Sequence, residues 1–228
     1  VLAAMGGKDE ARYDGVAESW AHEVPAFNTL AVECIAAPDA ALLPRVPGLA
    51  DDLFQSDGTM TKQEIRAVTL AKLMPMRGAL LWDIGCGCGS VAIEWMRAAR
   101  YARAIGIEPR ADRRAFAAAN ALALGAPKLD LIDGMVPAAL LGLDAPDAIF
   151  IGGGLSRETF DAAWAALRPL GRLVANAVTL ESEAELIALH KAHGGDLVKL
   201  SVHRAEPVGR LTGWRPLMPV TQWSLVKR

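Results

Sequence analysis

Three things are scarce in this sequence: cysteine, an excess of positive charge, and long apolar runs. The 228 residues contain three cysteines, too few for a disulfide framework and typical of a reducing compartment. No apolar run approaches the roughly 20 residues that span a bilayer. The formal net charge is −2, which argues against a broad basic surface for nucleic acid. We therefore expect a cytoplasmic protein whose partners are neither membranes nor nucleic acids.

Two of the cysteines, Cys86 and Cys88, stand one residue apart. Structural zinc sites combine such a pair with a second pair of Cys or His ligands. The sequence offers no second pair, so we expect no metal. We interpret both thiols as small residues that fill a loop.

The chain does contain a regular alternation of strand-like and helical segments after about residue 60. Thr61 and Glu64 match a capping box, which predicts a helix start with Ile65, Val68 and Leu73 on its buried side. Strands are predicted at residues 79–84, 104–108, 129–133, 147–151 and 171–176, and helices at 90–99, 110–124, 156–167 and 180–193. Two final extended segments, 196–204 and 219–227, can pair as an antiparallel hairpin.

The first 50 residues fit this alternation poorly. Residues 26–36 resemble a strand, and residues 37–48, rich in Pro and Ala, resemble a linker. We therefore predict an N-terminal extension over residues 1–45 and a main domain over residues 46–228. From these residues alone, the extension belongs either to the main domain or to a different domain upstream.

A glycine-rich loop follows the first predicted strand of the main domain. Asp83 precedes three alternating glycines, Gly85, Gly87 and Gly89, whereas dinucleotide sites space their glycines as G-x-G-x-x-G. The early third glycine and the acidic residue favour S-adenosylmethionine as the ligand. Together with the alternating elements, the loop predicts a class I S-adenosylmethionine-dependent methyltransferase fold. This α/β, Rossmann-like fold has a mostly parallel seven-stranded sheet and a C-terminal antiparallel hairpin.

Ligands of doubly wound sheets bind beyond the carboxyl ends of the strands. The glycine loop and the following helix N-terminus suit the methionine carboxylate, and Asp83 suits the amino group. Glu108 ends the second strand and can accept from both ribose hydroxyls. The third strand ends where adenine would lie. The predicted cofactor contacts are Thr61, Asp83, Gly85, Cys86, Gly87, Gly89, Glu108, Asp133, Gly134 and Met135.

Five short motifs occur in a specific order along the main domain. They are Thr61-Lys62-x-Glu64-Ile65-Arg66-Ala67, Asp83-Ile84-Gly85-Cys86-Gly87-x-Gly89-Ser90, Ile107-Glu108, Phe150-Ile151-Gly152-Gly153 and Asn176-Ala177-Val178-Thr179. Over about residues 55–205 the chain resembles the decarboxylating precorrin methyltransferases of cobalamin biosynthesis, specifically their carbon-15-methylating domain. That family usually carries an acid where this sequence has Met135. We expect Met135 to pack on the adenine ring, while Asp133 or a backbone group holds the adenine amine.

The resemblance implies methyl transfer to carbon 15 of a precorrin, loss of carbon dioxide from the acetate on carbon 12, and S-adenosylhomocysteine as product. Gly152, Gly153 and Asn176 would then lie at the methyl-transfer step. Because the substrate carries many carboxylates, cations are expected at the mouth of its site. The candidates are Lys62, Arg66, Arg157 and Arg204. The resemblance also implies a homotetramer and a fused upstream methyltransferase domain, whose tail would be residues 1–45.

Other interpretations remain open from the sequence. A methyltransferase of the same fold could act on tRNA or on a protein, although the chain has no basic run. A nicotinamide enzyme is disfavoured by the glycine spacing. A non-catalytic module that binds S-adenosylmethionine to regulate a fused partner is the alternative outside the enzymes.

Overall fold

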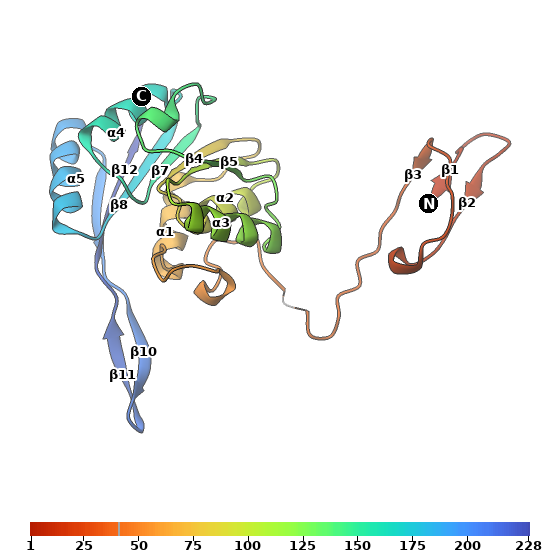
Figure 1. Cartoon of the computed structure of the whole chain (residues 1–228), viewed down its shortest axis with the longest axis horizontal. Helices are drawn as coiled ribbons and strands as arrows, with labels where there is room; N and C mark the ends of the chain where they lie inside the picture. The colour runs from red at the N-terminus through yellow and green to blue at the C-terminus, as the bar shows by residue number, and fades with distance from the viewer. Residues whose placement is uncertain (41) are drawn as a thin grey trace. The chain divides into compact units, whose positions relative to one another are not determined.

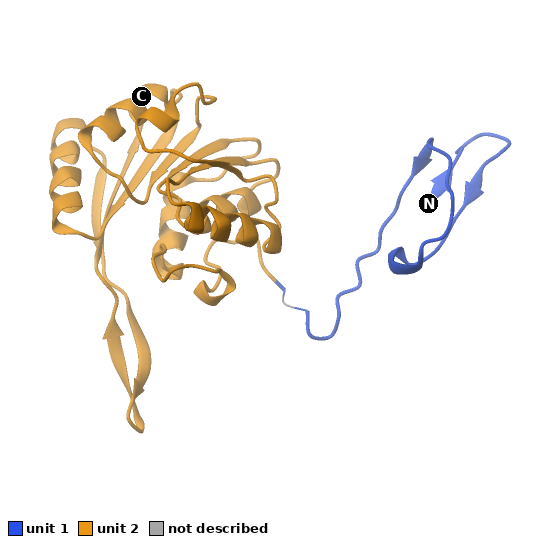
Figure 2. Cartoon of the chain, viewed as in Figure 1, with its two compact units in different colours: residues 1–42 blue, residues 43–228 orange. Residues whose placement is uncertain are grey.

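The computed structural model describes residues 1–40 and 42–228, which fall into two units, Val1–Leu42 and Leu43–Arg228 (Figures 1 and 2). The second unit is built on a seven-stranded sheet with the order β6-β5-β4-β7-β8-β12-β9. These strands are β6 (Asp130–Ile132), β5 (Arg103–Ile107), β4 (Leu80–Ile84), β7 (Ala148–Ile151), β8 (Arg172–Ala177), β12 (Val220–Val226) and β9 (Asp196–Leu200). The first five are parallel, and β12 runs antiparallel to both of its neighbours.

Helices cover both faces of this sheet (Figure 1). They are α1 (Gln63–Leu73), α2 (Ser90–Ala98), α3 (Ala111–Ala123), α4 (Arg157–Ala166) and α5 (Leu180–His193), with short 3-10 turns η2 (Asp51–Leu53) and η3 (Ala138–Leu140). Trp82 packs in one core with Phe160 of α4 and Leu186 of α5, whereas its neighbour Leu81 packs in another with Leu70 of α1. Because successive side chains of a strand point to opposite faces and helices cover both faces, every residue of β4 is buried, and all but Asp83 are apolar. The predicted fold class is confirmed.

The start of α1 differs from the prediction. The helix begins at Gln63 after Lys62, no side chain caps it, and Glu64 instead accepts hydrogen bonds from Arg204. The predicted capping box is therefore wrong. Val68, expected on the buried side, is 36% exposed, and Thr69 is fully buried. Ile65 and Leu73 are buried as predicted, and the error at Val68 arises because the polar Arg66 and Thr69 occupy part of the buried stripe.

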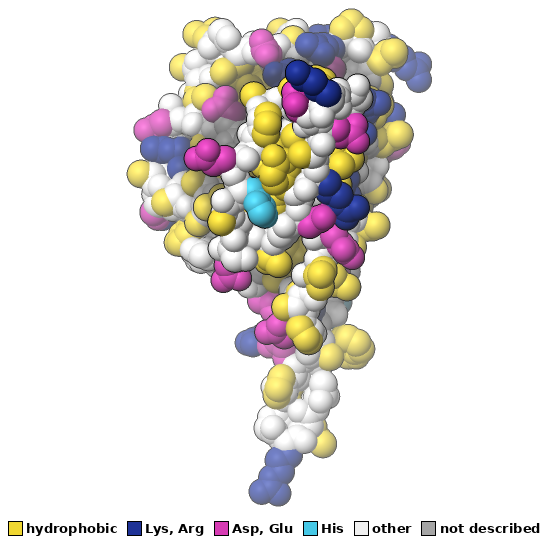
Figure 3. Space-filling view, turned by 90° about the vertical axis from the view of Figure 1, so that its right-hand side faces the viewer, with side chains coloured by type: hydrophobic (Ala, Val, Ile, Leu, Met, Phe, Trp, Pro, Cys, Tyr) yellow, Lys and Arg dark blue, Asp and Glu magenta, His cyan; other side chains and the backbone are white. Residues whose placement is uncertain are grey.

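A second hairpin, which the sequence did not predict, interrupts the C-terminal one. The expected pairing of residues 196–204 with 219–227 is confirmed for β9 and β12, but the chain between them forms β10 (His203–Val208) and β11 (Leu211–Pro216). This hairpin extends away from the sheet (Figure 1). Apolar side chains are spread along it and a basic side chain lies at its tip (Figure 3).

The first unit holds little regular structure. It contains three two-residue strands, β1 (Leu2–Ala3), β2 (Ala11–Arg12) and β3 (Asn28–Thr29), and the 3-10 turn η1 (Ala17–Ser19). The strand predicted over residues 26–36 is thus wrong beyond β3, since residues 30–36 are exposed and lie outside any strand. Among the described residues, no helix combines the length and apolar character needed to cross a membrane.

Candidate functional site

A cavity of about 890 Å³ lies at the carboxyl ends of the parallel strands. Its wall includes residues from the loops that follow β4, β5, β6 and β7, as expected for a doubly wound sheet. We call the part formed by the loops after β4, β5 and β6 the donor end. The part formed by the start of α1, the loop after β7, the end of β8 and the base of the β10–β11 hairpin is called the acceptor end.

The glycine loop forms the centre of the donor end. Gly85, Gly87 and Gly89 have φ angles of +70°, +54° and +79°, a region that side chains with a Cβ rarely adopt. A Cβ on Gly85 would also lie 2.9 Å from backbone atoms of Gly153. Gly89 is the N-cap of α2, so the loop leads directly into a helix N-terminus. All three glycines therefore have a structural requirement, and the backbone stays open to a ligand.

Asp83 lies under this loop and lines the cavity. Its Oδ2 accepts from the Ala92 amide of α2 at 3.0 Å, while its buried Oδ1 has no hydrogen-bond partner among the described residues. Desolvation by burial raises the pKa of Asp83 to about 7, and the nearby charge of Glu108 adds to the rise. A buried carboxylate oxygen without a partner suits a cationic group such as an ammonium.

Glu108 lies at the end of β5 and is almost fully buried. Oε2 accepts from the Gly87 amide at 3.0 Å, and Oε1 accepts from the Arg110 amide at 3.1 Å. Each carboxylate oxygen has a further lone pair. Glu108 therefore holds two loops of the donor end together and still has capacity for two hydroxyl groups.

The remaining predicted cofactor contacts divide in two. Thr61, Cys86, Gly134 and Met135 line the cavity, and burial raises the pKa of the Cys86 thiol, so it stays neutral. Asp133 is not part of the wall. Its carboxylate accepts two hydrogen bonds from Arg114, at 2.9 and 2.8 Å, and is 68% exposed. The structure thus brings Met135, and not Asp133, to the place expected for adenine.

Only one of the four predicted carboxylate-binding cations, Lys62, lines the cavity. Arg66 is completely buried and binds Glu94 at 2.6 Å and Asp51 at 3.1 Å. This geometry corrects the expectation for Arg66, because a buried guanidinium that already holds two carboxylates is not available to a substrate.

The other two cations are also engaged elsewhere. Arg204 donates to Glu64 and Asp51, each at 2.7 Å, and ties the base of the hairpin to α1. Arg157 pairs with Asp161 on the exposed side of α4. The structure therefore assigns neither of them to the cavity wall.

The acceptor end contains residues that the sequence did not single out. Gly152, Gly153 and Asn176 line it as predicted. The base of the unpredicted hairpin adds Arg215 and an apolar stretch at Leu217 and Met218. No local motif marks these residues, because they reach the cavity only through the hairpin.

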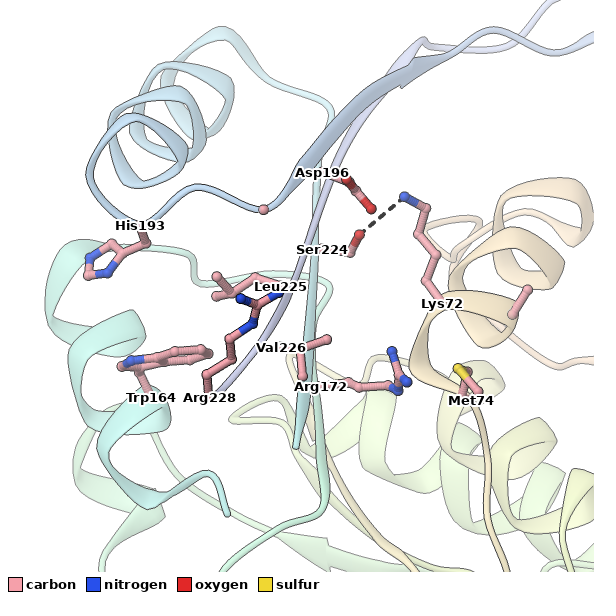
Figure 4. Close-up of a pocket in the computed structure, with 12 residues that line it drawn as sticks. Lys72, Met74, Trp164, Arg172, His193, Asp196, Ser224, Leu225, Val226 and Arg228 are labelled. Atoms are coloured by element: carbon pink, nitrogen blue, oxygen red, sulfur yellow. Dashed lines mark hydrogen bonds between the residues drawn. The ribbon is translucent and has the colours of Figure 1, made fainter. Parts of the chain in front are cut away.

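A second cavity, of about 600 Å³, lies at the other end of the strands, where β8 and β9 begin (Figure 4). Lys72 donates to Ser224 there at 3.1 Å. None of the predicted site residues lines this cavity. The candidate site is therefore the cavity at the carboxyl ends.

The strand order and the position of the glycine loop are those of the class I S-adenosylmethionine-dependent methyltransferase fold. The fold is shared with an S-adenosylmethionine-dependent O-methyltransferase from Thermotoga maritima, which superposes with a TM-score of 0.61 at 16% identity over 74% of this chain and 66% of that one. A family model described as precorrin methyltransferase domain matches residues 52–227, and the chain belongs to this family.

Individual relatives agree with this assignment. The precorrin-6Y C(5,15)-methyltransferase [decarboxylating] of Sinorhizobium sp. is 48% identical over 229 residues, which cover 100% of this chain and 55% of the relative. The C-terminal domain of precorrin-6Y C5,15-methyltransferase from Rhodobacter capsulatus superposes with a TM-score of 0.76 at 48% identity, over 81% of this chain and 100% of that one. The chain thus spans a little over half the length of the full-length relative.

A shorter relative comes from Saccharolobus solfataricus. It is named for C(15)-methylation of cobalt-precorrin-6B with decarboxylation. It is 37% identical over 144 residues, which cover 60% of this chain and 72% of the relative. The predicted family resemblance is therefore confirmed.

Proposed function

We propose that this chain transfers the methyl group of S-adenosylmethionine to carbon 15 of a precorrin, with decarboxylation of the carbon-12 acetate, in cobalamin biosynthesis. The main support for the proposal is that one cavity contains both the donor end, with its glycine loop, and the acceptor end. The chain that forms this cavity belongs to the precorrin methyltransferase domain family. The names of these relatives give the substrate class and both halves of the reaction.

The residues of the donor end fit S-adenosylmethionine. The free Oδ1 of Asp83 would take its ammonium group, Glu108 would accept from the ribose hydroxyls, and the amides at the start of α2 would face the carboxylate. When bound, the sulfonium supplies an activated methyl group. Met135 and Gly134 would then contact the adenine.

The acceptor end has to orient the macrocycle, since an electron-rich carbon can act as the nucleophile without a general base. Alignment of donor and acceptor alone can lower a barrier by about 7–11 kcal/mol. Gly152 and Gly153 leave room beside the methyl group, and Leu217 and Met218 provide an apolar wall. Of the four predicted cations only Lys62 is kept as a carboxylate ligand, and Arg215 is added to it, because both residues line the cavity at the acceptor end.

The test is incubation of the purified chain with S-adenosylmethionine and a precorrin, followed by mass spectrometry of the tetrapyrrole. We expect a product that has gained one methyl group and lost one carbon dioxide. Methylation of tRNA or protein, or binding of S-adenosylmethionine without any transfer, would overturn the proposal.

We further propose that the chain forms a homotetramer in the cytoplasm and that the first unit is the tail of a fused upstream methyltransferase domain. The exposed Val208, Leu211 and Trp214 of the hairpin support self-association. The length of the Sinorhizobium relative supports the upstream domain. Sedimentation velocity of the chain, with Leu211→Ser and Trp214→Ser as variants, tests the tetramer.

A further inference from the structure

A buried polar cluster lies behind the acceptor end, between α1 and the sheet. Its members are Thr69 of α1, Asn176 of β8 and Gln222 of β12. Asn176 Nδ2 donates to Thr69 Oγ1 at 3.2 Å, and Gln222 Nε2 donates to Thr69 Oγ1 and to Asn176 Oδ1, both at 2.9 Å. Thr69 and Gln222 are fully buried, whereas Asn176 also lines the cavity. The three residues are 46 to 153 positions apart in the sequence.

The hydrogen atoms of this cluster can be counted. Thr69 donates its only hydroxyl hydrogen to the Ile65 carbonyl at 2.8 Å, so toward both amides it can act only as an acceptor. Both amide groups must therefore turn an N–H toward Thr69. Gln222 uses its second N–H on Asn176, which in turn has to present its oxygen to Gln222. The orientation of the Asn176 amide follows from the Thr69 hydroxyl.

Packing alone does not account for this arrangement. The buried Oε1 of Gln222 has no partner among the described residues, and an unpaired buried carbonyl is unfavourable for stability. An apolar side chain at this position would avoid that cost. The cluster leaves Asn176 with one free N–H and one free lone pair beside the cavity.

We propose that Thr69 and Gln222 are positioning residues that fix the amide of Asn176, so that it offers one donor and one acceptor to the macrocycle. The inference rests on the proposed function and extends it to two residues that contact neither S-adenosylmethionine nor the precorrin. A precorrin matches this pair, because an acetate carboxylate accepts a hydrogen bond and a ring N–H donates one.

A double-mutant cycle tests whether Thr69 acts through Asn176. Thr69→Val keeps the shape and removes the acceptor, and it is made in the wild-type chain and in Asn176→Ala. We expect single-turnover methyl transfer to fall roughly 10- to 100-fold in the first background and to stay nearly unchanged in the second. The dissociation constant of S-adenosylmethionine should not change. Equal losses in both backgrounds would overturn the positioning role.

Three further variants complete the experiment. Thr69→Ser keeps the hydroxyl that Thr69→Val removes, so it should have nearly wild-type turnover. This comparison tests the positioning role even if Asn176→Ala is too slow to measure. Gln222→Met should behave as Thr69→Val does. Thr221→Val, which removes a buried hydroxyl from the same strand, should leave turnover unchanged. A wild-type chain that methylates no precorrin would overturn the proposed function itself, whereas failure of Thr69→Ser to rescue would overturn only the positioning role.

Discussion

The two ends of the cavity are held together in different ways. At the donor end, most of the contacts are made by main-chain atoms. Asp83 and Glu108 accept hydrogen bonds from main-chain amides, and the backbone of the glycine loop lies directly against the backbone of the loop after β7. At the acceptor end, side chains bind side chains, as in the Asn176–Gln222 pair. The donor end therefore depends on local chain geometry, and the acceptor end depends on contacts between distant segments.

This contrast fits two different ligands. A common cofactor can be recognised by one loop and two strand ends, an arrangement found in many proteins of this fold class. A particular macrocycle needs a wall of its own, and in the proposed function the hairpin base would supply part of it through Arg215 and Met218, which line the cavity. Changes at the donor end should therefore abolish all methyl transfer, whereas changes at the acceptor end should alter the use of the substrate.

The largest effect is expected for Gly85→Ala. An alanine at φ +70° is strained by about 1–2 kcal/mol, and its Cβ would meet the Gly153 backbone at 2.9 Å. We expect binding of S-adenosylmethionine to fall below detection in calorimetry. Gly142→Ala is the matched control, because Gly142 has φ +79° but open space around it. Normal binding by Gly85→Ala would contradict the backbone account of the donor end.

The same contrast explains what the sequence could predict. Asp83, Gly85 and Glu108 are predictable because each lies at or directly after the carboxyl end of a strand whose apolar pattern is clear, and parallel strands bring these ends together. The partners of Arg66 and Arg204 were not found. Arg66 meets Glu94 across 28 positions and Arg204 meets Glu64 across 140, so neither pairing leaves a local pattern.

The hairpin was missed for a related reason. The backbones of residues 203–208 and 211–216 pair with each other, and none of these residues is buried, so the segment lacks the clear alternation of buried and exposed residues that marks a half-buried strand. Arg215 and the other acceptor-end residues near it therefore could not be assigned from the sequence. The donor end is largely predictable from the sequence, whereas at the acceptor end the prediction reaches Lys62, Gly152, Gly153 and Asn176 but not the residues of the hairpin base.

The second prediction concerns Asp83→Asn. The substitution keeps an acceptor for the Ala92 amide but removes the charge that would face the ammonium group. Loss of one partner from a buried ion pair costs about 3–5 kcal/mol, so affinity for S-adenosylmethionine should fall at least roughly 100-fold at pH 8. Calorimetry measures this, and an unchanged affinity would remove Asp83 from the site.

Asp83 also sets a pH dependence whose sign can be worked out. Its pKa is about 7 in the folded chain and about 3.9 when unfolded. The folded state therefore holds this proton more tightly, and the contribution of Asp83 to stability falls as pH rises from about 4 to 7. Asp83→Asn should raise the melting temperature of the unliganded chain at pH 8 and not at pH 4. Wild-type affinity for S-adenosylmethionine should increase as pH rises through 7. Below that pH, binding should release a proton, so the binding enthalpy in calorimetry should vary with the ionisation enthalpy of the buffer.

A smaller effect at the donor end is expected for Glu108→Gln. One amide nitrogen replaces a carboxylate oxygen, so either the Gly87 or the Arg110 amide loses its acceptor. A hydrogen bond to a charged group contributes about 1.5–3 kcal/mol, which predicts a roughly 10- to 100-fold weaker affinity. Glu181→Gln, an exposed change in the first turn of α5, is the control. If Glu108→Gln and Glu181→Gln bind S-adenosylmethionine with equal affinity, Glu108 does not bind the ribose.

The smallest effect is expected at the acceptor end, for Arg215→Leu. Arg215 lines the cavity but is exposed, and it pairs with Glu206 across the hairpin at 2.9 Å. An exposed ion pair contributes about 0.2–1 kcal/mol. The KM for the precorrin should therefore rise about two- to fivefold, while affinity for S-adenosylmethionine stays constant. Glu206→Gln breaks the same pair but leaves the guanidinium in place, so its KM should not rise. If both variants raise KM equally, the ion pair between Arg215 and Glu206 matters only for the local structure of the hairpin. The guanidinium of Arg215 would then not bind the precorrin at the acceptor end.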